Sequence, residues 1–251
     1  MPEHELTEAV RNRDYDWDGF NSQWYKQHNY DELRKDDQQI LEIVRDHFAA
    51  ESGRGLRGID VGAGANLYPA LAMLPYCDRV VLYERSAANR RWLTGQLTAP
   101  DESWRLFWDV LAERSPYGEL DGVRALLPRR LSVVPGDVLT VTEVAEYDMA
   151  TMFFVAESIS TELREFSTAV ERFLGLIKPG GRFAAAFMKE SAGYRVDETL
   201  YPAVAISETD VRQQFPADQV TVDIHPIELV DPFRKGYGGM IVATGTVNPI
   251  I

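Results

Sequence analysis

A glycine-rich segment flanked by two acids has the clearest chemical meaning in the chain. Asp60 precedes Gly62 and Gly64 within the segment 58–68, and Glu84 closes the next apolar run. Glycines at a strand-to-helix turn let a ligand approach the backbone, and a carboxylate at the end of the next strand can bind ribose hydroxyls. The spacing therefore predicts a nucleoside site. A glycine turn with a purely structural role is the alternative.

The residues around this turn favour one nucleoside over others. Leu67 stands where a dinucleotide fingerprint needs a third small residue. An acid just before the glycines opposes a pyrophosphate but suits a ligand with a positive end. S-adenosylmethionine has such an end, because it carries an ammonium and a sulfonium. The pattern Asp-x-Gly-x-Gly resembles the first motif of class I methyltransferases, which implies that Asp60, Gly62, Gly64 and Asn66 bind this cofactor.

Composition narrows the class of protein. The 251 residues, 45% of them hydrophobic, are enough for one substantial core, so we expect a single domain over 1–251. Within it, 1–50 should form a lid and a helix, and 51–251 an α/β core with a helical insertion at about 100–130. A net charge of −13 argues against nucleic acid and anionic membrane as partners. The partner should be a small molecule, and the protein a monomer or a homodimer.

Other features bear on location and metals. No apolar run reaches the roughly 18–20 residues that span a bilayer, and the first residues lack the basic and apolar parts of a signal peptide, so a cytoplasmic protein is expected. A single cysteine, Cys77, excludes internal disulfides and cysteine-rich zinc sites. The histidines are scattered without ligand spacing, so no metal site is expected; they are His4, His28, His47 and His225.

The elements that must position these residues alternate along the chain. Apolar periodicity predicts helices at 31–50, 68–74, 87–97, 162–177 and 210–215. Apolar runs predict a strand before the glycine turn and others at 80–83, 131–134, 147–155, 182–188, 220–224 and 240–244, with a turn at 178–181 and a glycine-rich bend at Gly236, Gly238 and Gly239. This order resembles the Rossmann-like, seven-stranded α/β sandwich of class I methyltransferases, in which ligands sit at the carboxyl ends of the strands.

The N-terminal aromatic residues make the resemblance narrower. Phe20-Asn21, Tyr25 and Tyr30 are similar to the opening segment of the nicotinamide, phenylethanolamine and indolethylamine N-methyltransferase family. The likeness extends over nearly the whole chain and includes Tyr68 after the glycine turn, Asn89 after the ribose acid, Trp104 and Trp108 in the insertion, and Asp137-Val138. It implies that Tyr25, Tyr30 and Tyr68 hold the methionine carboxylate, Glu84 and Asn89 the ribose, and Asp137 with Val138 the adenine. An N-terminal helical and aromatic lid should close over the cofactor.

Two acids are candidates for the chemistry of the methyl acceptor. An aliphatic amine arrives protonated, so a carboxylate must bind the cation or remove its proton. Glu157 follows the fourth strand and Glu190 the fifth, near positions where the amine-directed relatives carry acids. Glu157 as a helix cap or salt-bridge partner, and Glu190 as a solvated surface acid, are the structural alternatives.

The pattern departs from that of the relatives where the acceptor should bind. Ala186 stands where the nicotinamide enzyme has an acid, and Tyr201-Pro202 replaces a small hydroxyl residue, so nicotinamide is not the expected acceptor. Tyr194, Tyr201 and Phe233 are candidates for an aromatic wall around a flat or cationic acceptor, or for ordinary core.

The predicted function is S-adenosylmethionine-dependent methyl transfer to a nitrogen of a small amine or N-heteroaromatic. The alternatives are an O- or C-methyltransferase of a secondary metabolite and a non-catalytic module that binds the cofactor.

Overall fold

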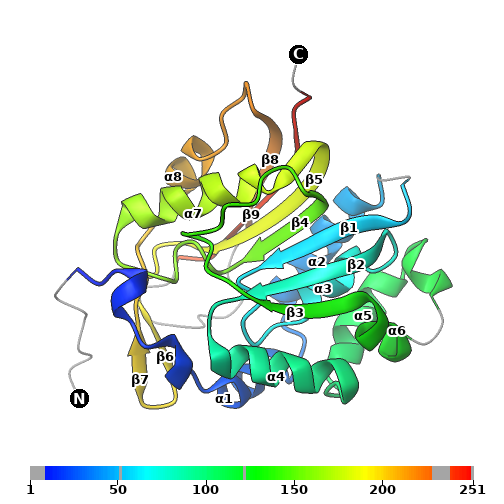
Figure 1. The fold of residues 1–251 in the computed structure, drawn as a ribbon, viewed down its shortest axis with the longest axis horizontal. Helices are drawn as coiled ribbons and strands as arrows, with labels where there is room; N and C mark the ends of the chain where they lie inside the picture. Colours follow the sequence, from blue (N-terminus) through cyan, green and yellow to red (C-terminus); the bar gives the residue numbers. More distant parts are fainter. Residues whose placement is uncertain (1–8, 51–52, 121–122, 228–237, 250–251) are drawn as a thin grey trace.

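A seven-stranded, mostly parallel sheet forms the centre of the computed structural model, which describes residues 9–50, 53–120, 123–227 and 238–249 (Figure 1). The strand order is β3-β2-β1-β4-β5-β9-β8, and β9 is antiparallel to both of its neighbours. The strands are β1 (Leu56–Val61), β2 (Cys77–Glu84), β3 (Leu131–Pro135), β4 (Tyr147–Phe153), β5 (Ile177–Met188), β8 (Val220–Ile227) and β9 (Met240–Val247). The order confirms the expected Rossmann-like α/β class.

Helices cover both faces of this sheet. In Figure 1, α7 crosses one face while α2 and α3 lie behind the other. The helices of the core and insertion are α2 (Lys35–Phe48), α3 (Tyr68–Met73), α4 (Ala87–Thr98), α5 (Trp104–Ala112), α6 (Val123–Arg130), α7 (Leu163–Gly175) and α8 (Glu208–Gln213), with a short 3-10 helix at Tyr117–Glu119. The sheet thus separates two apolar clusters, one under α2, α3 and α5 and the other under α7 and α8.

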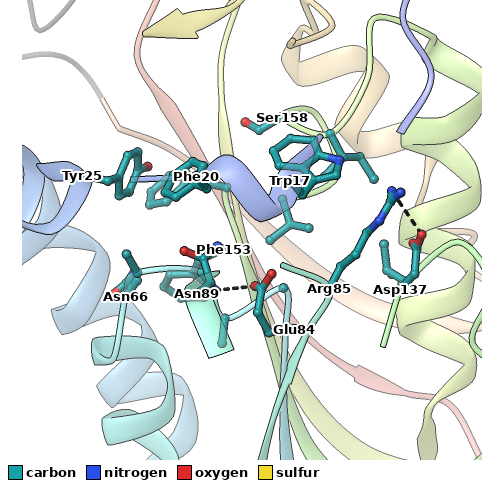
Figure 2. Close-up of a pocket in the computed structure, with 18 of the residues that line it drawn as sticks. Trp17, Phe20, Tyr25, Asn66, Glu84, Arg85, Asn89, Asp137, Phe153 and Ser158 are labelled. Atoms are coloured by element: carbon teal, nitrogen blue, oxygen red, sulfur yellow. Dashed lines mark hydrogen bonds and ion pairs between the residues drawn. The ribbon is translucent and has the colours of Figure 1, made fainter. Parts of the chain in front are cut away.

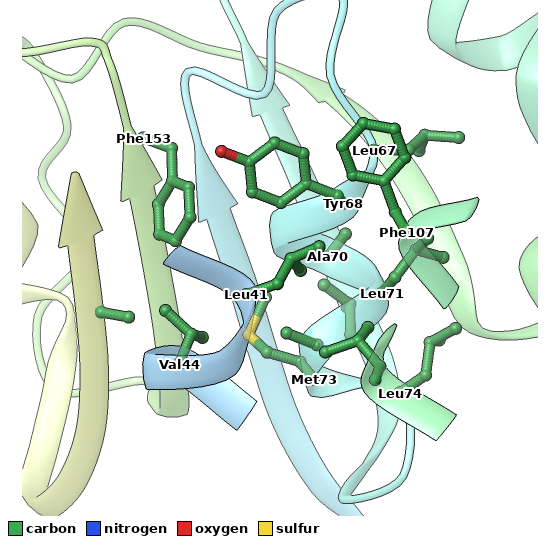
Figure 3. Close-up of a cluster of buried hydrophobic side chains, with 14 of the residues drawn as sticks. Leu41, Val44, Leu67, Tyr68, Ala70, Leu71, Met73, Leu74, Phe107 and Phe153 are labelled. Carbon is green, nitrogen blue, oxygen red and sulfur yellow. The ribbon is translucent and has the colours of Figure 1, made fainter. Parts of the chain in front are cut away.

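Helix α3 is the most enclosed of the helices that follow the glycine turn. All six of its residues are buried, because α2 and α5 cover the side that the sheet does not (Figure 3). Tyr68 stacks on Phe107 of α5 with ring centroids 5.3 Å apart and meets Phe153 of β4 edge-on. A helix that is apolar all round needs such an enclosure. The glycine turn in front of it is therefore attached to rigid elements on both sides.

The N-terminal segment lies over the carboxyl edge of the sheet. It contains two 3-10 turns, η1 (Asn12–Asp14) and η2 (Trp17–Gly19), and helix α1 (Ser22–Tyr30), which Asn21 caps by accepting from the backbone N–H of Trp24. A small hairpin, β6 (Tyr194–Val196) and β7 (Thr199–Tyr201), lies beside this segment (Figure 1). Tyr201 of the hairpin packs among Tyr15, Trp17 and Phe20.

Several local expectations need correction. A helical N-terminal lid is expected without bounds, and the structure places its helix, α1, at Ser22–Tyr30. The β6–β7 hairpin is not expected, because its strands are too short to show a period. The helix expected from residue 31 begins at Lys35, since Arg34 is extended. The predicted turn at 178–181 lies inside β5 as a bulge, because the register with β4 jumps from Ile177 to Arg182. Gly236 of the predicted bend and Phe233 of the predicted aromatic wall lie outside the described residues.

Among the helices in the described ranges, none combines the length and the apolar character needed to cross a membrane.

Candidate functional site

A cavity of about 110 Å³ lies at the carboxyl ends of β1, β2, β3 and β4, where the N-terminal segment covers them. Figure 2 shows Glu84, Asn89 and Asn66 on one side and the aromatic residues Trp17, Phe20 and Tyr25 on the other. The lining joins segments that are far apart in the sequence: Asn12, Trp17, Phe20, Tyr25 and Tyr30 from the lid, Gly62–Asn66, Glu84, Arg85 and Asn89, Gly136–Val138, Phe153–Val155, Ser158, Ile159 and Tyr194.

The glycine turn requires glycine for two separate reasons. Gly62 and Gly64 have φ values of +66° and +59°, a region that side chains other than glycine rarely adopt. A Cβ at Gly62 would also lie 2.6 Å from both methyl groups of Val155, another residue of the cavity wall. The turn therefore lets the backbone approach both the opposite wall and whatever occupies the cavity.

Glu84 is the central polar group of the site. Its Oε2 accepts from the backbone N–H of Gly64 at 2.7 Å, and its Oε1 accepts from that of Ser86 at 2.6 Å. Burial raises the pKa of Glu84, while these two donors and the Asn89 side chain oppose the rise. Asn89 is itself held by Ser22 of α1, whose Oγ donates to Asn89 Oδ1 at 2.7 Å. The carboxylate and the amide are thus fixed side by side, as the predicted ribose site requires.

Asp137 lies at the cavity with its carboxylate already contacted by several donors. The Nδ2 of Asn12 lies 3.1 and 3.0 Å from its two oxygens, and Arg85 Nη1 is 3.3 Å from Oδ2 (Figure 2 shows the pair with Arg85). The backbone N–H of Leu139 donates to Oδ1 at 2.9 Å. Val138 lines the same part of the cavity and is buried.

Asp60 lies below the turn rather than on the cavity wall. It is fully enclosed, and Thr151 Oγ1 donates to its Oδ1 at 2.7 Å, whereas Oδ2 has no hydrogen-bond partner among the described residues. Burial raises the pKa of Asp60 to about 8. A cation or a proton near this carboxyl group would relieve the cost of its desolvation.

The three tyrosines predicted to hold the methionine carboxylate separate into two groups. Tyr25 and Tyr30 line the cavity, and their rings meet edge-on with centroids 6.0 Å apart. Asn66 lines it as well and donates from Nδ2 to the Tyr30 hydroxyl at 3.4 Å. Tyr68 lies behind Tyr30 in the core, and its hydroxyl donates to Asp37 Oδ1 at 3.1 Å. Tyr68 is therefore one layer removed from the cavity.

The two candidate acids occupy different environments. Glu157 is fully buried; its Oε1 accepts from the backbone N–H of Met188 at 3.0 Å and from Ser158 Oγ at 3.1 Å. Its Oε2 has no hydrogen-bond partner within the described part of the chain, and burial raises its pKa to about 7. Glu190 is exposed, and its backbone N–H donates to Ile206 O. Of the two, only Glu157 has the desolvated carboxyl group of a general base.

A second, smaller cavity adjoins the first. It holds only about 10 Å³ and shares Tyr30 and Phe154 with the larger cavity. Its other lining residues are Asn29, Arg34, Asp37, Met188 and Met240. Asp37 is buried there, and its desolvation, reinforced by the charge of Asp36, raises its pKa to about 7. Glu157 touches this region through the backbone of Met188.

The residues predicted for the acceptor wall also separate. Tyr194 lines the larger cavity near Tyr25, with ring centroids 6.4 Å apart. Tyr201 stacks on Tyr194 with ring centroids 5.4 Å apart and is buried among Tyr15, Trp17 and Phe20 of the N-terminal segment. Ala186 is buried on β5, where it pairs with Phe153 and Val242.

Several lining residues were missed by reasoning from sequence. Trp17 lies in an N-terminal segment rich in aromatic residues and Phe20 belongs to the motif that resembles the family, so the sequence carries a signal for both. Arg85 directly follows Glu84, and its position after a strand is a weaker signal. Asn12 and Phe154 have no sequence signal, because only the tertiary structure brings them to the cavity.

The sheet order and a cavity at the carboxyl ends of the parallel strands, lined by aromatic residues and a few polar groups, define a Rossmann-like α/β protein. Solved structures with this fold include the N-methyltransferase NodS from Bradyrhizobium japonicum, crystallised with S-adenosyl-L-homocysteine (TM-score 0.57, 11% identity, 94% of this chain and 100% of that one). Another is a SAM-dependent methyltransferase from Methanosarcina mazei (TM-score 0.54, 12% identity, 88% of this chain and 100% of that one). At these identities the likeness shows the fold. The chain belongs to the NNMT/PNMT/TEMT family, whose model matches residues 8–235.

Similar proteins include phenylethanolamine N-methyltransferases from several mammals. The human enzyme is 25% identical over 186 residues and the rhesus macaque (Macaca mulatta) enzyme 26% over 184 residues, in each case 69% of this chain. The match spans 65% of the length of each of these enzymes.

Proposed function

We propose that this protein transfers a methyl group from S-adenosylmethionine to a nitrogen of a small-molecule amine or N-heteroaromatic. The observation that carries the proposal is the joining of Glu84, Asn89 and the glycine turn at one cavity, in a chain of an N-methyltransferase family. The family membership, the fold and the structural neighbour crystallised with S-adenosyl-L-homocysteine support the cofactor.

The residues at the cavity fit this cofactor in chemical terms. Glu84 and Asn89 supply an acceptor and an amide for the ribose hydroxyls, and the turn at Gly62 and Gly64 leaves room beside the backbone. Val138 would face the adenine ring, with Asp137 at its edge. Tyr25, Tyr30 and Asn66 would hold the methionine carboxylate, with Tyr68 supporting Tyr30 and Asp60 balancing the ammonium from below.

The cofactor, when bound, supplies a methyl group on a positively charged sulfur. In the transfer the acceptor nitrogen forms a bond to this carbon while the sulfur–carbon bond breaks, so the nitrogen must first expose its lone pair. Glu157 would take the proton from an ammonium, because burial raises the pKa of its carboxyl group to about 7 and its Oε2 has no hydrogen-bond partner among the described residues.

We assign the acceptor to the region between the two cavities. Tyr30 and Phe154 border both, and Glu157 contacts Met188 of the smaller one. Tyr194 and Tyr25 would then cover the acceptor from the lid side, and their ring faces attract a cation. Glu190, which is exposed, would act on the acceptor only after a rearrangement.

A calorimetric titration with S-adenosylhomocysteine, followed by a screen of amines and N-heteroaromatics with labelled cofactor, tests the proposal. Binding followed by N-methylated products is the expected outcome. Label found only on oxygen or carbon acceptors would move the enzyme to another class of methyltransferase, and binding without turnover of any acceptor would favour a non-catalytic module. A protein that fails to bind S-adenosylhomocysteine would contradict the proposal itself.

A further inference from the structure

Asn12 carries a buried polar atom, its Oδ1, that has no role in the contacts of the candidate site. Its side chain is 2% exposed and lines the larger cavity. Its Nδ2 is bound to Asp137, but its Oδ1 has no hydrogen-bond partner among the residues that the structure describes. A buried acceptor left without a donor is unfavourable, so a ligand that supplies the donor is favoured.

The direction of the Asn12 amide follows from chemistry. A carboxylate only accepts hydrogen bonds, so the group that faces Asp137 must be the NH2 group of Asn12. The carbonyl oxygen is then directed away from Asp137. A ligand group that faces this oxygen must therefore donate a hydrogen bond, and a ligand acceptor there would be repelled by the Asn12 carbonyl.

Asp137 itself has little capacity left for the adenine amino group. A carboxylate offers about four lone-pair positions. Asn12 Nδ2 approaches both oxygens and Leu139 N–H donates to Oδ1, so three of these positions face donors. The Arg85 guanidinium lies against Oδ2 as an ion pair.

Asn12 is also held firmly in place. Its backbone N–H donates to Glu165 Oε2 at 2.8 Å, and its carbonyl accepts from Trp17 Nε1 at 3.1 Å and from Arg85 Nη1 at 2.6 Å. The N-terminal segment is therefore docked on α7 and on the end of β2 at the position where the orphaned oxygen lies.

We propose, given the function proposed above, that Asn12 Oδ1 accepts a hydrogen bond from the exocyclic amino group of the cofactor's adenine, and that Asp137 and Arg85 position Asn12 for this role. The site then selects 6-amino purines over 6-oxo purines, because a carbonyl at that place would face the Asn12 carbonyl. Recognition of the base is coupled to closure of the N-terminal segment, since Asn12 belongs to that segment.

The experiment compares two ligands by calorimetry: S-adenosylhomocysteine and its analogue with hydrogen in place of the amino group of the purine. The parent chain should bind the analogue about tenfold more weakly. In Asn12→Leu the two ligands should bind equally, because the acceptor is gone. Arg11→Gln, which breaks only the surface ion pair of the same segment with Glu162, is the matched control and should keep the tenfold ratio. Asp137→Asn should weaken both ligands and keep a preference for the amino form.

The inference is overturned if Asn12→Leu keeps the tenfold ratio, or if the ratio disappears in Asp137→Asn alone. If Asn12→Leu fails to fold, Asn12→Ala repeats the comparison with a smaller change. The parent chain also provides a test, because equal binding of the two ligands would exclude any acceptor at the amino group. If the parent chain binds no S-adenosylhomocysteine, the proposed function fails as well. Binding that is insensitive to the amino group contradicts only the role of Asn12.

Discussion

Replacing Glu157 by glutamine should make the protein more stable and less active. The substitution keeps the shape of the side chain and its acceptor oxygen, so the hydrogen bonds from Met188 N–H and Ser158 Oγ can remain. What disappears is a carboxyl group that burial desolvates and whose second oxygen has no partner in the described part of the chain.

The magnitude follows from the pKa of Glu157, which rises from 4.5 to about 7 on folding. An acid with a raised pKa binds its proton more tightly in the folded state, so its contribution to stability falls as the pH rises from about 4.5 through 7. Each pKa unit corresponds to about 1.4 kcal/mol, which makes the loss roughly 3 kcal/mol above pH 8. Glu157→Gln should therefore match the parent chain near pH 4.5 and exceed its free energy of unfolding by up to roughly 3 kcal/mol at pH 8.5.

Turnover should change in the opposite direction. Loss of a general base lowers the rate by about 10²- to 10⁴-fold, while the affinity for S-adenosylhomocysteine stays nearly constant because Glu157 is not among the residues that line the larger cavity. Urea unfolding at several pH values, calorimetry and a labelled-cofactor assay measure the three quantities. Glu190→Gln is the matched control, since that side chain is exposed, and its unfolding curve should not move.

The reasoning is refuted if Glu157→Gln is no more stable than the parent chain at pH 8.5, because the carboxyl group is then not desolvated. Undiminished turnover would refute its role as base.

Three further outcomes are expected. Glu84→Ala should weaken binding of S-adenosylhomocysteine by at least about tenfold in calorimetry, because Gly64 and Ser86 lose their acceptor and the ribose loses its own; unchanged affinity would place the ribose elsewhere. Gly62→Ala should lower the free energy of unfolding by at least about 1–3 kcal/mol, since φ is +66° and the new Cβ meets Val155. The matched change Gly95→Ala lies in α4 with open space around it and should raise the free energy of unfolding by about 0.5–1 kcal/mol. If Gly62→Ala and Gly95→Ala shift thermal unfolding equally, the positive φ and the close approach of Val155 do not explain the need for glycine at position 62. Burial lowers the pKa of His47 from 6.5 to about 4, so the unfolded chain binds the proton first and stability falls as the pH drops from 6.5 to 4. Between pH 6.5 and pH 4, the free energy of unfolding of His47→Gln, measured by urea titration, should fall by up to about 3 kcal/mol less than that of the parent chain. If the free energies of both proteins fall by the same amount, the lowered pKa of His47 is contradicted.

The core strands and the main helices were predictable from sequence because their apolar periods are regular. Strand β4 and helix α7 have long apolar patterns and were found within about two residues of their ends. The β6–β7 hairpin has strands of three residues, which is too short for any period to show. The start of α2 was predicted four residues early for a different reason: Leu33 fits the apolar period of the helix, but the backbone at Arg34 is extended, so the helix begins only at Lys35.

The candidate site was predictable where a residue type serves a local purpose. Gly62 and Gly64 are needed for positive φ, and Glu84 closes a strand next to them, so their joint role follows from short-range chemistry. Tyr25, Tyr30 and Asn89 were placed by resemblance, and the structure brings all three to the cavity. Which tyrosine reaches the cavity and which is buried behind it depends on packing, as Tyr68 on Asp37 illustrates.

The sequence by itself thus determined the alternation of strands and helices, the glycine turn and the acid that faces it, because these depend on period and on backbone geometry within a few residues. Only the tertiary structure decided that Asn12 contacts Asp137, 125 positions away in the sequence. It also decided that the Glu157 side chain is buried while Glu190 is exposed to solvent, and that the Tyr68 hydroxyl donates to Asp37. Burial and orphaned hydrogen-bonding groups arise when distant segments are packed together, and no local pattern of residue types encodes them.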